Sequence, residues 1–439
     1  MKENKIGLYF IAASLLALLL GLIFGNIGGF QYVIPDFLKT SLSFQKTRPL
    51  HVTLVITWIF NGAVGGIYYY LPQVSGRKLY SEFLARVHFF LFIATGLIII
   101  PCYFMGIFGG KEYLEFPPWI AILMLISWLL FLFNFFMTIP KNFSQWKIYN
   151  WMWATGIIFF LITFGEAYLW TLPFFNNNVV RDTTVQWKAM GSMAGSWNML
   201  IYGTAFFVME KISGTDKTTT AKRTFFFYFL GLTNLMFNWG HHTYIVPASG
   251  WIRNVAYAIS MTELLILGSI IYSWRRTVKD MKDYYQNIPA RFLSAADVWV
   301  FLNLILAIIM SVPAINFYTH GTHITVAHAM GATIGINTMI LLASIFYIVS
   351  KEFPALIQVH LRKIKIGFWV LNISLFFFWI SLIGMGIVKA GGEIADKDFS
   401  TILQILEPWF FYFSIAGVGV FIGVLLLVFT FPFSTIKNI

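Results

Sequence analysis

The sequence predicts an all-α integral membrane protein with twelve transmembrane helices, and three observations support that fold class. The 439-residue chain is 58% hydrophobic and only 11% charged, whereas soluble domains carry about 25% charged residues. Apolar runs of about 20 residues, long enough to cross ~30 Å of hydrocarbon, recur along the whole chain. Lysine and arginine are concentrated in alternate connections between those runs.

The apolar runs define the expected elements. We place the spans at residues 7–29, 51–74, 83–108, 117–139, 151–173, 187–209, 224–246, 253–274, 296–318, 327–350, 366–388 and 407–432. Residues 1–439 then form a single membrane domain. The first run lacks a clear cleavage site and leads directly into further spans, so it is predicted to be a retained helix rather than a signal peptide.

The basic residues predict the orientation. With the N-terminus placed inside, 21 of the 30 lysines and arginines fall on the inner side and 9 on the outer side. This bias predicts that both termini lie on the cytoplasmic side of the membrane. The net charge of +12 reflects topology and not nucleic-acid binding. The single cysteine, Cys102, excludes an intrachain disulfide and a Cys-x-x-Cys-His haem attachment site.

Ionisable residues of the first four spans lie near the membrane surfaces. His51 begins the second span at its outer end, and Arg48 lies three residues earlier, at the outer surface. His88 stands near the inner end of the third span, far from the other histidines, and is predicted to be structural. In the following outer loop, Glu115 either binds a hard cation or solvates the loop.

The middle spans carry two carboxylates and a histidine pair. Glu166 lies in the fifth span and Glu263 in the eighth. A carboxylate inside a span is costly and is a functional candidate by default. The seventh span approaches the outer face at His241-His242, and adjacent helical residues about 100° apart can both reach one metal after a slight adjustment. The sixth span contains no His, Cys, Asp or Glu, and the last two spans are predicted to be scaffold.

The tenth span offers two haem ligands. His328 and Met330 are two residues apart and point to nearly opposite faces of a helix. Histidine and methionine both coordinate haem iron, so one helix can present an axial ligand to a haem on each side. Taken alone, the same residues are also typical of a helix cap and of packing against lipid.

Depth in the membrane decides between these interpretations. The predicted topology places His51, His241, His242 and His328 in the outer part of the membrane, on three different helices. Buried polar residues at one depth indicate a shared site, and haem, with apolar faces and a need for axial ligands, is the expected occupant. Arg48 would then be in reach of a haem propionate, or would serve as an interfacial anchor.

These residues resemble a known family, the catalytic subunits of cytochrome-c-dependent nitric oxide reductases within the haem–copper oxidase superfamily. The resemblance covers nearly the whole chain. Its motifs are Arg48-x-Leu50-His51, Gly109-x-Lys111-Glu112-x-Leu114-Glu115, Gly240-His241-His242 with Glu263 21 residues later, and Tyr318-Thr319-His320-Gly321 followed by Ala327-His328. The implied fold is a bundle like subunit I of the haem–copper oxidases.

The resemblance also implies roles for individual residues. His51 would ligate a low-spin haem b, and His328 a high-spin haem b3. His241 and His242 would hold a non-haem metal facing that second haem. Glu263 would belong to a carboxylate cluster near the site, and Glu115 would resemble a calcium ligand beside the haem propionates.

The sequence departs from the family at two places. Met330 stands where the family has the second histidine of the low-spin haem, and a His/Met pair would still hold that haem and raise its potential. In the sixth span Met190, Ala194 and Asn198 replace a histidine and two glutamates. Three outcomes remain open: iron with fewer protein ligands and more water, copper held by the histidine pair and Met190, or no second metal.

The reaction implied by the resemblance is 2 NO + 2 e⁻ + 2 H⁺ → N₂O + H₂O. Electrons would come from a small membrane-anchored cytochrome c subunit on the outer face, and Glu263 would carry protons. Two other function classes remain open. One is a divergent enzyme that reduces O₂ or another small nitrogen species, and the other is an electron-transfer or gas-sensing cytochrome without the second metal. A transporter whose histidines bind substrate is a further alternative.

Overall fold

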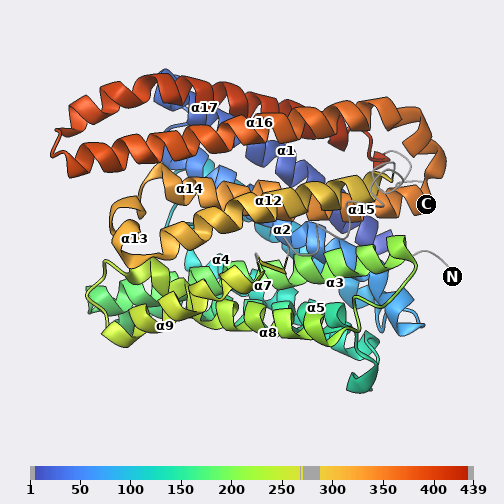
Figure 1. Cartoon of the computed structure of the whole chain (residues 1–439). Coiled ribbons are helices and arrows are strands. Elements are labelled where there is room, and N and C mark those ends of the chain that lie inside the picture. Colours follow the sequence, from blue (N-terminus) through green and yellow to red (C-terminus); the bar gives the residue numbers. More distant parts are fainter. Residues whose placement is uncertain (1–4, 267, 270–286, 434–439) are drawn as a thin grey trace. The chain divides into compact units, whose positions relative to one another are not determined.

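The computed structural model describes residues 5–266, 268–269 and 287–433 (Figure 1). Within these ranges helices are the only extended regular structure, apart from one isolated bridge between Lys111 and Leu114. The all-α prediction is therefore confirmed for the described residues. Contacts divide the chain into two compact units, which comprise Met1–Phe143, Ile348–Ser381 and Leu403–Ile439 in the first and Ser144–Tyr347 and Leu382–Ile402 in the second.

The first unit is built on two long helices in backbone contact. It contains α1 (Lys5–Val33), α2 (Phe44–Ser75), α3 (Glu82–Phe104), α4 (Pro118–Thr138) and parts of α16 (Pro354–Ile394) and α17 (Phe399–Val428). Gly7 on α1 faces Gly65 on α2, and a Cβ added to Gly7 would lie 2.6 Å from the Gly65 carbonyl oxygen. Small residues at such a crossing let membrane helices pack backbone against backbone.

The second unit holds most of the predicted site. Its helices are α5 (Ile148–Glu166), α7 (Val179–Ser213), α8 (Lys222–Phe237), α9 (Gly250–Met261), α12 (Ile288–Ser311), α13 (Pro313–Thr319), α14 (His323–Met330), the first part of α15 (Met339–Glu352) and the remaining parts of α16 and α17. Short elements are η1 (Phe143–Gln145), η2 (Leu169–Thr171), α6 (Pro173–Asn176), the 3₁₀ helix η3 (Asn238–Thr243) and the π-helical η5 (Gly331–Thr338). Gly156 seats α5 against α7, because a Cβ there would lie 2.7 Å from the Ser196 carbonyl oxygen.

The expected number of twelve spans is not confirmed. Among the described residues, nine helices are long and apolar enough to cross a membrane. The predicted spans 187–209, 224–246 and 253–274 fall on α7, on α8 with η3, and on α9. Helix α7 is long enough, but polar residues in its first half lower its hydropathy. Helices α8 and α9 have only 16 and 12 residues. Much of the predicted basic inner loop 274–295 lies outside the described residues.

Two boundaries differ from the expectation in ways that affect the site. Helix α2 begins at Phe44, so His51 lies in its second turn and not at its start as predicted. The tenth span runs as a continuous helix from His323 to Glu352 but changes to π-helical geometry directly after Met330. π-Helical segments are rare and occur frequently at functional sites.

Candidate metal centre and haem ligands

His51 is held by the helix packed against it. Its Nδ1 lies 2.7 Å from the carbonyl oxygen of Gly21 on α1. Since a carbonyl only accepts, Nδ1 carries the proton and Nε2 keeps its lone pair. The ring fits because position 25 is a glycine, where a Cβ would lie 2.6 Å from His51 Nδ1. The arrangement suits an axial ligand, since ligating histidines almost always donate their other ring N–H to a carbonyl or carboxylate.

Arg48 pairs with the acidic loop of the first unit. Its guanidinium donates to the Glu112 carboxylate and lies 3.0 Å from Oε1 of Glu115. The loop turns back through Tyr113, which has a φ of 72°, and through Gly110, where a Cβ would lie 1.8 Å from the Leu114 carbonyl oxygen.

Burial raises the pKa of Glu115, against the opposing effect of Arg48. The second oxygen of Glu115, Oε2, is buried and has no hydrogen-bond partner among the described residues. Arg48 as a propionate ligand and Glu115 as a calcium ligand stay predictions.

The histidine pair lies on the 3₁₀ helix η3, with ring centroids of His241 and His242 4.3 Å apart. Asn238, three residues before His241, places its Oδ1 3.0 Å from His241 Nδ1. Residues i and i+3 of a 3₁₀ helix eclipse each other, which explains this contact. From α9, Ser260 donates to the same Asn238 oxygen, and Glu263 accepts from Asn238 Nδ2 at 3.1 Å. Glu263 and His241 therefore both form hydrogen bonds with the side-chain carboxamide of Asn238.

Two ring side chains to which the sequence assigned no role complete this cluster. The Trp187 indole stacks on His242, with centroids 4.7 Å apart and an interplanar angle of 7°. The His320 ring lies 5.9 Å from that of His242 and 5.7 Å from that of Trp187. His320 lies between two membrane-spanning helices, and burial lowers its pKa. His320 belongs to a motif noted above, but only the fold brings it beside His242.

His328 and Met330 both lie in the last turn of α14. Within the second unit His328 is close enough to interact electrostatically with His241 and His242. Nδ1 of His328 is buried and has no hydrogen-bond partner among the described residues. His51 belongs to the first unit and Met330 to the second. Their pairing on one haem stays a prediction.

The residues present provide two imidazole donors for a second metal. Nδ1 of His242 and Oε2 of Glu263 are buried without a hydrogen-bond partner in the described structure. Across residues 5–266, 268–269 and 287–433, no three His, Cys, Asp or Glu side chains are grouped so as to hold a metal ion. Met190, on α7, stays a predicted ligand. Asn198, further along α7, accepts a hydrogen bond of 3.0 Å from Asn337 in η5, so an amide pair occupies that position.

Two further ionisable candidates have structural partners. Glu166 forms an ion pair with Lys188, within the second unit. His88 is 1% exposed, lies 3.0 Å from the Tyr68 hydroxyl through Nδ1 and stacks on Phe131, as expected for a structural histidine.

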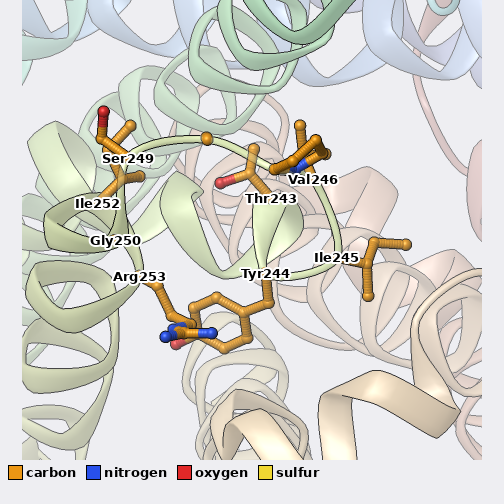
Figure 2. A pocket seen from close by; sticks show the side chains of 10 residues that line it. Thr243, Tyr244, Ile245, Val246, Ser249, Gly250, Ile252 and Arg253 are labelled. Atoms are coloured by element: carbon orange, nitrogen blue, oxygen red, sulfur yellow. The ribbon is translucent and has the colours of Figure 1, made fainter.

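A pocket follows directly after the histidine pair in the chain. Figure 2 shows Tyr244 and Arg253 side by side at one edge of it. The Tyr244 hydroxyl donates to the Ser311 carbonyl at the end of α12, at 3.2 Å. The lining residues are Thr243, Tyr244, Ile245, Val246, Pro247, Ala248, Ser249, Gly250, Ile252 and Arg253.

The all-helical fold agrees with the comparisons. Residues 5–420 match the family model described as Cytochrome C and Quinol oxidase polypeptide I. The chain therefore belongs to this family, subunit I of the haem–copper oxidases, whose members are oxidoreductases, and it is an integral membrane protein.

Individual relatives come from two branches. The chain is 26% identical to a nitric oxide reductase subunit of Stutzerimonas stutzeri over 455 residues, covering 96% of this chain and 93% of that protein. It is 23% identical to the Cbb3-type cytochrome c oxidase subunit CcoN1 of the same organism, covering 88% and 84%. A cryo-EM structure of a haem–copper terminal oxidase dimer matches with a TM-score of 0.70 at 15% identity, covering 99% of this chain and 83% of that chain.

Proposed function

We propose that this protein reduces two molecules of NO to N₂O and water. The observation that supports this most is the His241–His242 pair with the Glu263 carboxylate one carboxamide away. The similarity to a nitric oxide reductase subunit over 96% of the chain points the same way. When bound, two haems b and a second metal would relay electrons from an external donor and provide the sites for NO.

The chain's own residues divide the remaining work. His51 and Met330 would hold the low-spin haem, and His328 the high-spin haem. His241 and His242 would hold iron or copper, with Met190 as a candidate third donor. Oε2 of Glu263 is free to exchange a proton, and the reaction consumes two of them. By analogy with its relatives, a small membrane-anchored cytochrome c subunit would donate the electrons.

A second candidate function is reduction of O₂. It is favoured by two specific observations, the similarity to several cytochrome c oxidase subunits and the absence of His, Asp and Glu from residues 187–209 of α7. Substitution of metal ligands can change which small molecule is reduced while the fold is retained.

One assay separates these functions. The purified protein, reduced by ascorbate and a redox mediator, receives either ¹⁵NO or O₂. We expect ¹⁵N₂O by mass spectrometry at a rate that exceeds O₂ consumption, and we expect the His241→Ala/His242→Ala double variant to lose it. Rapid O₂ consumption without ¹⁵N₂O would replace the proposal by the oxidase function. Neither activity, with haems present, would favour an electron carrier or sensor.

A further inference from the structure

The contacts around Asn238 fix which way its side-chain amide faces. Nδ2 donates to Glu263 Oε1 at 3.1 Å, and a carboxylate offers only acceptors. Oδ1 therefore faces the other way, toward His241 Nδ1 at 3.0 Å and toward the Ser260 hydroxyl that donates to it. Two independent groups, one on α9 and the other two residues beyond its end, thus hold the amide in one orientation.

That orientation dictates the tautomer of His241. Because Asn238 Oδ1 is an acceptor, the ring nitrogen facing it must carry the proton. In a neutral imidazole the other nitrogen, Nε2, then has the free lone pair that a metal requires. Hydrogen bonds of this kind to the non-ligating nitrogen set ring orientation and ligand basicity.

We propose that Asn238 is a positioning residue that locks His241 in the Nδ1–H tautomer, so that Nε2 is the nitrogen presented to a metal. The inference deepens the proposed function and rests on it only for the identity of the ligand. Glu263 acts here through its acceptor oxygen Oε1, separately from the free oxygen Oε2.

The helix pair provides a matched control. Asn234, one turn earlier on α8, also bridges to α9, since its Nδ2 donates to the Thr262 hydroxyl at 3.2 Å. It has no hydrogen bond to a histidine among the described contacts. Asn238→Leu and Asn234→Leu therefore each remove a side-chain carboxamide from the same helix interface. Only Asn238→Leu removes a hydrogen-bond partner of His241. Asn238→Asp keeps an acceptor opposite Nδ1.

The test is ¹⁵N solid-state NMR of the protein in lipid vesicles, with ring-labelled histidine, chelator treatment to remove loosely held metal, and the haems reduced and CO-bound. The difference between wild type and His241→Phe isolates the His241 signals. We expect a protonated Nδ1 and an unprotonated Nε2 in wild type, Asn234→Leu and Asn238→Asp, and loss of that pattern in Asn238→Leu. We also expect Asn238→Leu to bind added Fe²⁺ about 10–100-fold more weakly than Asn234→Leu.

Two results would overturn the inference. One is a wild-type His241 that is protonated at Nε2, and the other is an Asn238→Leu variant with the wild-type spectrum. Misfolding of both leucine variants leaves the wild-type and Asn238→Asp spectra to decide it. The expected spectra in a protein that makes no N₂O would uphold the inference and reject the proposed function alone.

Discussion

At the scale of single residues, His51 and His241 share one arrangement. In each, Nδ1 meets an oxygen acceptor, the Gly21 carbonyl or the Asn238 amide, and Nε2 remains available. The sequence places both histidines at one depth in the membrane, and the family resemblance implies that both are ligands. It does not predict either acceptor, because one is a main-chain carbonyl on another helix and the other depends on η3 being a 3₁₀ helix.

Glu263 is expected to carry protons and not to hold a cofactor. Glu263→Gln keeps an oxygen that accepts from Asn238 but loses the ionisable group. We expect turnover with NO to fall about 100-fold or more, the size typical of lost proton transfer, with both haem signals and the second metal retained. Turnover at the wild-type rate in the same assay would remove Glu263 from the proton path.

Met330 and His328 are expected to serve different haems. Met330→Ala should abolish or shift the low-spin haem signal and leave the other haem bound, whereas His328→Ala should remove the high-spin haem. Optical and EPR spectra of the two variants check this. A Met330→Ala spectrum identical to wild type would refute the His51/Met330 pairing.

At the scale of elements, α1 forms the wall behind His51. Gly25→Ala would place a methyl group 2.6 Å from His51 Nδ1, whereas Gly28→Ala meets Phe44 and Thr47 only at 3.6 Å, an ordinary contact. We expect Gly25→Ala to lose or shift the low-spin haem, and overpacking of this kind costs about 1–3 kcal/mol. Gly28→Ala should keep the wild-type spectrum. Equal haem spectra in both variants would show that α1 does not position His51.

Most helices could be predicted from apolar runs, and nine predicted spans match helices long and apolar enough to cross a membrane. The three spans that are not confirmed fall on α7, on α8 with η3, and on α9, and the end of the last one lies outside the described residues. In α7, polar residues of the first half lower the hydropathy on which such a prediction rests. The role of α7 was also only partly foreseen. Its lack of metal ligands was evident in the sequence, but the stacking of Trp187 on His242 was not, because no spacing rule links those residues.

At the scale of the whole molecule, the family follows from motifs spread over nearly the full chain, and the match over residues 5–420 confirms it. The particular reaction does not follow in the same way. Relatives with both nitric oxide reductase and oxidase names share this fold, and the distinguishing ligands of α7 are absent here. The function therefore depends on what the His241–His242 pair holds.

The most direct test is the haem and metal content of the purified protein, by pyridine haemochrome and elemental analysis. We expect two haems b and one further iron or copper per chain. We also expect His241→Ala/His242→Ala to lose the further metal and keep both haems. Two haems with no further metal in wild type would contradict a two-metal catalytic centre and indicate an electron-carrying or gas-sensing cytochrome.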